Sequence, residues 1–239
     1  QPPTPSDDDD DEVEIVDAAS FRTAPCVVPG LRLGSTVLGG QRMQGLFTTR
    51  RIEKCVPIGV YTGRAMRASE FGQTTEKIAR EYAYGLGIDV ESTQLDIVIV
   101  PPFGADGKVD LKKHPLAAIN EPPPAAVANV QMTTIGVPLD RMEEAGRPTD
   151  FVEPLIMLVA YTSRRVDPGE QLYVHYGGTY KDFRNYAVGS ASNVNCDIEV
   201  DQLFPSRVPW RCVVTISRAM VDDVDDDSGS DEDWKPGME

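Results

Sequence analysis

The middle of the chain is a series of short hydrophobic runs, separated by glycine, proline and charged residues. Most of these runs have the length of β-strands and are too short for a long helix. We therefore expect strands within 31–60, at 95–100 and at 131–135, and again at 155–162 and 172–176. The run at 155–162 (LIMLVAYT) is the most hydrophobic of these, so it predicts a buried central strand.

One longer stretch predicts a helix. Ser69 is a favourable N-cap for a helix that begins near Glu70 and continues to about Tyr84, before the glycine-rich stretch 85–87. This helix falls within residues 64–117, which we interpret as an insert in the strand-rich part of the chain. Many short strands with few helices indicate a β-rich α+β fold.

Charge is distributed unevenly along the chain, whose net charge is −15. Residues 1–17 hold eight acidic and no basic side chains, and residues 220–239 hold nine acidic side chains and one lysine. Residues 18–219 hold 21 acidic and 22 basic side chains, so the body is nearly neutral. Two readings of the arms stay open: they are disordered and solvated, or they hold a basic partner near the body. The sequence has no basic stripe, so direct DNA binding is not expected.

The cysteines carry no metal-site signature. They are widely spaced, form no C-x-x-C pair and are accompanied by only two histidines: Cys26, Cys55, Cys196, Cys212, His114 and His175. A zinc site is therefore not expected. We expect reduced thiols in an intracellular protein, although the spacing alone leaves two disulfides open. No hydrophobic run approaches the ~18 residues of a membrane span and no signal peptide is visible, so membrane association is not expected.

The most informative pattern lies at residues 168–180 (PGEQLYVHYGGTY). A turn opens the stretch, and a short strand follows in which Leu172, Val174 and Tyr176 share one face. Tyr176 closes this strand before a Gly-Gly turn, so its ring can be buried while its hydroxyl points into a cavity. Taken alone, the pattern favours a core tyrosine with a satisfied hydroxyl.

Residues 169–177 (GEQLYVHYG) closely resemble the closing motif of SET-domain protein lysine methyltransferases, commonly G-E-E-L-x-x-D-Y-G. Two earlier stretches resemble that family's motifs in the right order. Residues 43–47 (MQGLF) resemble G-x-G-[LVI]-[FR], with Met43 in place of the first glycine. Nearby, residues 58–63 (IGVYTG) resemble E-Y-x-G, with Val60 in place of glutamate.

The other stretch, residues 117–130, resembles the family signature R-F-[IL]-N-H-x-C-x-P-N. Asn120 matches the first asparagine and Asn129 the closing one, whereas Glu121 replaces the histidine and the cysteine is absent. Three prolines between them fix the backbone, so the segment is an irregular loop and neither a helix nor a strand. Without the resemblance it would be interpreted as a linker.

The resemblance covers about Val28 to Tyr180, roughly two-thirds of the chain. It implies a SET fold of small curved sheets with a knot-like C-terminal segment. The domains that follow are an acidic arm at 1–17, the SET domain at 27–180 with its insert at 64–117, an extension at 181–219 and an acidic tail at 220–239.

The resemblance also implies a function, which is S-adenosylmethionine-dependent methylation of a protein lysine, without a metal. A basic histone tail would be the leading substrate, in the nucleus or else in the cytoplasm. The cofactor-binding residues would be Met43, Gln44, Gly45, Leu46, Asn120, Glu121 and Tyr176. Tyr176 would be the catalytic residue, and Tyr61, Val174 and Tyr180 would line the substrate channel.

Several departures from the motifs keep other readings open. Met43, Glu121, Val174 and His175 favour a degenerate SET module that binds a basic peptide without transferring a methyl group. A methyltransferase for a non-histone protein is a further alternative. The Cys-rich segment that completes the cofactor pocket in many family members is absent. Phe204 or Trp210 would then supply a lid, unless they are ordinary core residues.

Overall fold

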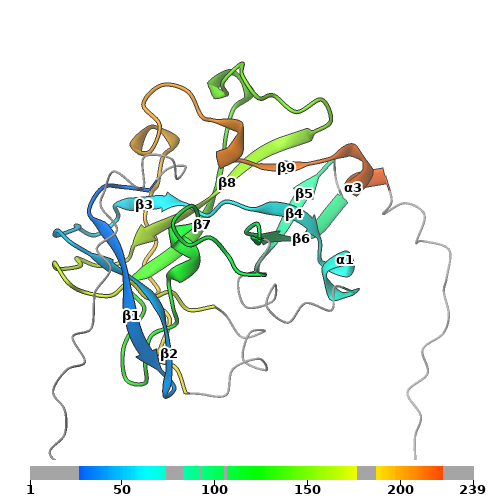
Figure 1. The fold of residues 1–239 in the computed structure, drawn as a ribbon. Helices are drawn as coiled ribbons and strands as arrows, with labels where there is room; N and C mark the ends of the chain where they lie inside the picture. The colour runs from blue at the N-terminus through cyan, green and yellow to red at the C-terminus, as the bar shows by residue number, and fades with distance from the viewer. Residues whose placement is uncertain (1–26, 74–82, 92, 105–106, 177–186, 223–239) are drawn as a thin grey trace, which may run out of the picture.

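The computed structural model describes residues 27–73, 83–91, 93–104, 107–176 and 187–222. Within these residues the chain forms three antiparallel sheets and few helices, which confirms the predicted β-rich α+β class. Figure 1 shows the hairpin β1–β2 on one side, the sheet around β8 in the middle and the β4–β6–β5 sheet on the other side.

The strands group by sheet. The first sheet contains β1 (Leu31–Leu38) and β2 (Gln41–Thr48); the second contains β3 (Pro57–Val60), β7 (Val130–Gly136), β8 (Val152–Thr162) and β9 (Val214–Ile216); the third contains β4 (Arg64–Arg67), β5 (Tyr84–Val90) and β6 (Thr93–Val100). The helices are α1 (Ala68–Gln73), α3 (Arg218–Asp222) and the short 3₁₀ helices η2 (Pro115–Ala118), η3 (Leu139–Arg141), η5 (Val200–Gln202) and η6 (Trp210–Cys212).

Strand β8 is the buried central strand that its hydrophobic run predicts. Because side chains alternate along a strand, Met157 and Val159 face one core, which contains residues of the C-terminal extension. Leu158 faces a second core against β5 and β6, and Ala160 faces a third core beneath β1 and β2. Burying a large aliphatic side chain contributes roughly 1.5–3 kcal/mol, so a strand with two buried faces anchors the whole domain.

Two expectations about secondary structure are wrong. A helix was expected from Glu70 to Tyr84. The structure shows helix α1 at the start of this range, whereas Tyr84 begins strand β5. Residues 74–82 lie outside the described residues. Tyr84 belongs to a strand because half-buried or buried side chains alternate with exposed ones, with a period of two, from this residue onward. Ile88 and Val90 are buried, the residue between them is exposed, and the strand pairs with β6. The strand expected at residues 172–176 is instead a set of isolated bridges, in which Tyr173 pairs with Asn120 and Val174 with Val130.

The closing motif threads between two segments that are distant in sequence. The N–H of Val174 donates to the carbonyl of Asn120 at 2.9 Å, and the carbonyl of Tyr173 accepts from the N–H of Val130 at 2.9 Å. Buried Asn129 reinforces this arrangement, because its Oδ1 accepts from the N–H of Tyr173 at 2.7 Å. Residues 171–174 therefore lie between the segment at Asn120 and the segment at residues 129–130.

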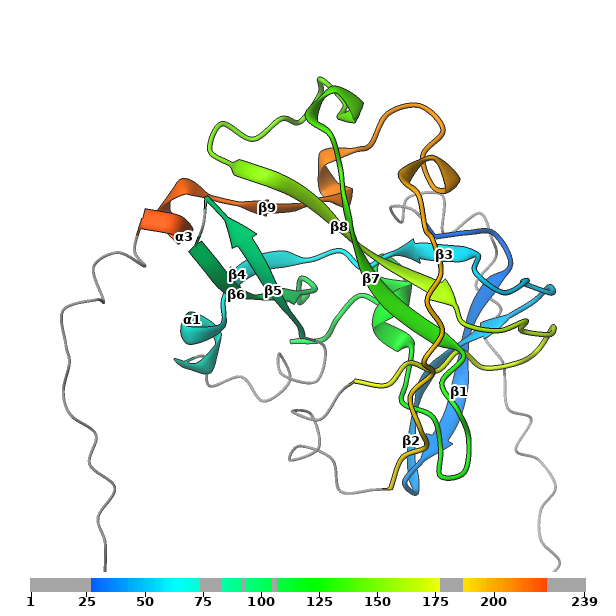
Figure 2. The ribbon, with the colours of Figure 1, turned by 180° about the vertical axis from the view of Figure 1, so that it is seen from behind.

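The extension covers the loop at 122–128 and then follows β7 (Figure 2). Hydrogen bonds between residues 189–194 and the body include Gly189 N to Pro122 O, Ser190 N to Ala126 O, Ala128 N to Ser190 O, Gln131 Nε2 to Ser192 O and Tyr161 Oη to Val194 O. A disulfide between Cys55 and Cys196, with Cα atoms 5.4 Å apart, fastens the end of this segment. The expectation of reduced thiols is wrong for this pair.

Gly189 is the tightest point of this packing. A Cβ at this position would overlap the carbonyl oxygen of Ala126 and lie 2.7 Å from that of Pro123. Since both are backbone atoms, G189A should destabilise the protein by about 1–3 kcal/mol in chemical denaturation. G136A is the matched control because no atom lies within 4 Å of a Cβ there. Equal stability of the two variants would contradict the packing described here.

Candidate active site

Tyr176 is held at its hydroxyl and at its backbone. Its Oη donates to the carbonyl of Ile119 at 2.5 Å, and its N–H donates to Oε1 of Glu121 at 3.3 Å. The ring packs, partly buried, against the core beneath β1 and β2. Leu172 and Val174, which share its face of the predicted strand, lie in that core with exposed fractions of 0% and 8%. The hydroxyl is therefore fixed at the loop that carries Asn120.

Asn120 connects this loop to the hairpin β1–β2. Its Nδ2 donates to the carbonyl of Gln44 in β2 at 2.9 Å, across 76 residues of sequence. In the described part of the chain, its Oδ1 accepts no hydrogen bond, so this oxygen is available to a ligand with an N–H donor. The short helix η2 lies just before Asn120 and starts at Pro115. The first N–H groups of a helix have no partner within the helix, so a proline at this position loses no hydrogen bond.

The motif at residues 43–47, where the resemblance implies cofactor contacts, lies in a strand. Residues 43–47 are part of β2 and pair with β1, and the turn falls at residues 39–40. Met43 is half-buried, Gly45 is buried and Leu46 is a core residue with 0% exposure. Gln44 is exposed and reaches the neighbouring cavity, so it is the motif residue best placed to meet a ligand.

Gln171 explains why position 45 is a glycine. Its side chain crosses the hairpin so that a Cβ on Gly45 would lie 2.5 Å from Nε2. Oε1 of Gln171 accepts from the hydroxyls of Thr36 at 2.8 Å and Tyr173 at 3.0 Å, whereas buried Nε2 has no hydrogen-bond partner among the described residues. Sequence reasoning missed this residue, although a glutamine inside an alternating hydrophobic motif was a visible signal.

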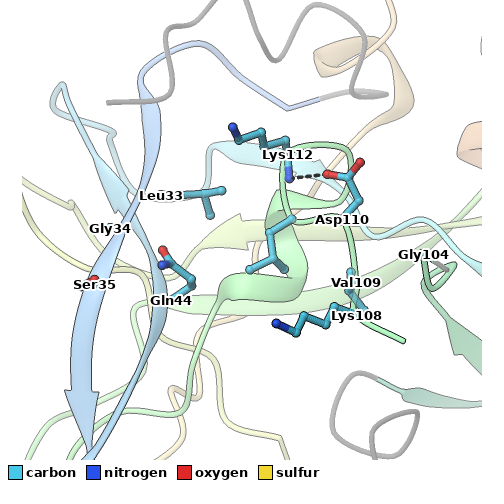
Figure 3. A pocket seen from close by; sticks show the side chains of 10 residues that line it. Leu33, Gly34, Ser35, Gln44, Gly104, Lys108, Val109, Asp110 and Lys112 are labelled. Atoms are coloured by element: carbon cyan, nitrogen blue, oxygen red, sulfur yellow. Dashed lines mark hydrogen bonds between the residues drawn. The ribbon is translucent and has the colours of Figure 1, made fainter. Parts of the chain in front are cut away.

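A cavity of about 540 Å³ opens between the hairpin and residues 108–112 (Figure 3). Gln44 and Leu33 form one wall, and Lys108, Asp110 and Lys112 form the opposite wall. Its volume lies within the range of small-molecule sites. Burial alone would raise the pKa of Asp110, but hydrogen bonds from Lys113 and Lys112 and the charge of Lys113 lower it. The polar residues that line the cavity therefore include two lysines, one aspartate and one glutamine.

The closing motif is anchored by an ion pair at its start. Glu170 accepts hydrogen bonds from Arg164, from Asn129 and from the N–H of Asp167. Burial by itself raises the pKa of Glu170, but these hydrogen bonds and the charge of Arg164 lower it further than burial raises it. Glu170 therefore stays ionised at neutral pH and holds the turn before residues 171–176.

The predicted channel residues do not all come together in the described structure. Tyr61 lines a second cavity of about 10 Å³, which has room for about one water, and Val174 is a core residue. Tyr180 lies outside the described residues. Tyr84, which sequence reasoning placed on a helix, stacks beside Tyr61 with ring centroids 6.2 Å apart, and burial raises its pKa. The channel remains a prediction.

Phe204 and Trp210 do not form a lid in this structure. Both are buried in the core on the face of β8 that carries Met157 and Val159, and Trp210 stacks on Phe151 with ring centroids 5.1 Å apart. Among the described residues, no cluster of His, Cys, Asp and Glu could hold a metal ion. No described helix is long and hydrophobic enough to cross a membrane.

Comparison with known proteins gives matches among solved structures alone. No protein-family model matches the chain, and no curated protein matches it. Among solved structures, the SET domain of the RIZ1 tumor suppressor (PRDM2) is similar, with 14% sequence identity and a TM-score of 0.41. The match covers 77% of this chain and 88% of that chain. At this identity and TM-score the likeness assigns no role to any residue.

Replacing Asn120 tests whether its amide belongs to a binding site. N120A removes an acceptor for a charged ligand group, so it should weaken S-adenosylmethionine binding by about 10-fold or more. Calorimetry measures the change. N193A is the matched control, since Asn193 is exposed in the extension. Equal affinities of N120A, N193A and the unmodified chain would exclude Asn120 from the site.

Proposed function

We propose that this chain is an S-adenosylmethionine-dependent protein lysine methyltransferase of the SET type. The observation that carries the proposal is the convergence of three motif stretches. The hydroxyl of Tyr176 bonds to the carbonyl of Ile119, and Asn120, the next residue, bonds to the carbonyl of Gln44. These contacts join residues 57 and 76 positions apart in the sequence, as expected of motifs that form one site.

The residues around the cavity fit the methyl donor. S-adenosylmethionine carries a carboxylate, an ammonium group and a sulfonium whose methyl group is electrophilic. Lys108 and Lys112 are lysines that line the cavity and would attract the carboxylate, and Oδ1 of Asn120 would accept from the ammonium group. Gln44 lines the cavity, and its backbone carbonyl accepts from Nδ2 of Asn120, so Gln44 connects the cavity with Asn120.

Methyl transfer needs positioning more than it needs an activated side chain. The neutral amine of lysine forms a bond to the methyl carbon as the carbon–sulfur bond breaks, and the product ammonium loses its proton to solvent. Holding reactants in line can supply on the order of 7–11 kcal/mol. The hydroxyl of Tyr176 donates its proton to the carbonyl of Ile119, so its oxygen would accept a hydrogen bond from the amine and orient it. Its place beside the amine would also exclude water. Tyr61 and Tyr84 provide an aromatic surface near this core.

A basic protein tail suits this chain as the substrate, and a histone tail in the nucleus is the leading choice. Seventeen acidic side chains lie in the two terminal arms, whereas the body is nearly neutral. Attraction between these arms and a basic tail would raise its local concentration and would weaken at high salt. A degenerate SET module would use the same attraction to bind a basic peptide without transfer.

Two measurements made together test the proposal. Calorimetry measures binding of S-adenosylmethionine to the full chain, and a radiolabelled transfer assay uses mixed core histones, with mass spectrometry to locate the lysine. Binding with transfer establishes the activity. Binding without transfer to histones directs the assay to other basic proteins. Absence of binding would overturn the enzymatic proposal and leave the peptide-binding module.

A further inference from the structure

We propose that Glu121 is a positioning residue for Tyr176, whose backbone N–H it holds through a buried carboxylate. The inference rests on the proposed function, since Tyr176 is a catalytic residue only within it. It also accounts for a departure from the motif, because glutamate stands here where histidine is usual in the resembled family. In this proposal the side chain at position 121 supports Tyr176, with a carboxyl group in place of an imidazole.

The geometry is a clamp formed by three consecutive residues on the end of the closing motif. The carbonyl of Ile119 accepts from the hydroxyl of Tyr176, and the carbonyl of Asn120 accepts from the N–H of Val174. Oε1 of Glu121 accepts from the N–H of Tyr176 at 3.3 Å. The first two acceptors are backbone atoms that any residue supplies. Only at position 121 does the clamp depend on the identity of the side chain.

Burial makes this contact unusual. The side chain of Glu121 has an exposed fraction of 0%, and glutamate is rarely buried without a compensating contact. The N–H of Tyr176 supplies such a contact at Oε1, because it gives a buried acceptor a hydrogen bond that water cannot provide there. A buried glutamate that merely filled space would be replaced by a hydrophobic residue at lower cost.

The loop that carries Glu121 is restricted by its prolines and by a hydrogen bond to the extension. Pro122, Pro123 and Pro124 restrict its backbone, and the carbonyl of Pro122 accepts from the N–H of Gly189 in the extension. The carboxylate is therefore attached to a fixed backbone and not to a mobile loop. With its N–H and its hydroxyl both bonded, Tyr176 is fixed at two ends of the residue, as an orienting hydroxyl requires.

The test compares E121Q with E121M in the full chain. Glutamine keeps an oxygen that can accept from the N–H of Tyr176, whereas methionine has a similar length and no strong acceptor. Three quantities are measured: kcat, the dissociation constant of S-adenosylmethionine, and hydrogen exchange of single amides by nuclear magnetic resonance. The N–H of Val174 is an internal control, because its acceptor is the backbone of Asn120.

We expect E121M to lower kcat by about 10- to 100-fold, because small misplacements of a catalytic group have effects of this size. Although the resemblance implies a cofactor contact at position 121, the buried side chain of Glu121 does not line the cavity, so donor affinity should change by less than about threefold. E121Q should turn over at least about 10-fold faster than E121M. The amide of Tyr176 should exchange about 10-fold faster in E121M than in E121Q, while that of Val174 does not change.

Equal kcat in the two variants would overturn the proposal, as would equal acceleration of exchange at Val174 and Tyr176, which would indicate a general loss of the loop. The exchange comparison needs neither donor nor substrate. If the unmodified chain neither binds the donor nor transfers a methyl group, the proposed function fails. The amide of Tyr176 would still decide whether Glu121 holds this residue.

Discussion

If the proposed function holds, replacing Tyr176 by phenylalanine should lower methyl transfer by about 100-fold or more, which is the usual effect of removing one preorganised polar group from a transition state. The phenylalanine ring fills the same part of the core, so donor affinity should change by less than about threefold. What is lost is the hydroxyl that is fixed by the carbonyl of Ile119 and that orients the attacking amine. A radiolabelled transfer assay and calorimetry on the same preparation separate these two effects.

Tyr173→Phe is the matched control for this experiment. Tyr173 is three residues earlier in the same motif, and its hydroxyl bonds to Gln171 on the hairpin side. Loss of that bond should cost about 1 kcal/mol of stability without a large change in transfer. If Y173F and Y176F lose transfer equally, or if Y176F retains full transfer, the assignment of Tyr176 as the catalytic residue is wrong.

The hydrophobic runs contain most of the information needed for the sheets. A run such as 155–162 predicts β8 because eight consecutive buried residues in a protein of this size require a strand with two covered faces. The segment around Tyr84 was harder, because aromatic and aliphatic spacing near residues 70–84 fits a helix as well as a strand. Pairing with β6 decided the outcome, and such pairing is not visible in a local pattern.

The motifs singled out Asn120 and Tyr176 but gave no sign of the residues that support them in the structure. Their order along the chain placed Asn120 and Tyr176, and the structure joins them through Ile119. The roles of Gln171 and Glu121 depend on which atoms lie across from them, at Gly45 and at the N–H of Tyr176. Neither distance follows from spacing in sequence, since the partners are separated by long stretches that fold in between.

The disulfide between Cys55 and Cys196 was the feature hardest to predict from the sequence. Four cysteines without a C-x-x-C pair allow several pairings as well as none, and only the fold brings Cys55 close to Cys196. Such bonds persist in oxidising compartments and are rare in the cytosol and the nucleus. Measuring the oxidation state of this pair in cells is therefore a direct test of the proposed nuclear location.

Removing this bond should have the largest effect on stability. The two cysteines are 141 residues apart, and closing a loop of that length restricts the unfolded chain strongly. We expect the double variant C55S/C196S to lose about 2–5 kcal/mol of unfolding free energy, the usual range for a native disulfide. Urea denaturation of the oxidised protein and of the variant measures this difference. The double substitution is used because a single one would leave a reactive thiol.

A reducing agent supplies the control. A dithiol should lower the stability of the unmodified protein to about that of C55S/C196S, and it should leave the variant unchanged because Cys212 is buried outside any disulfide. Hydrogen exchange should then rise first at residues 187–196, whose bonds to the loop at 122–128 depend on a fastened end. Since that loop carries Glu121 at its start, reduction should also lower methyl transfer. If oxidised and reduced protein unfold at the same urea concentration, the bond does not stabilise this fold.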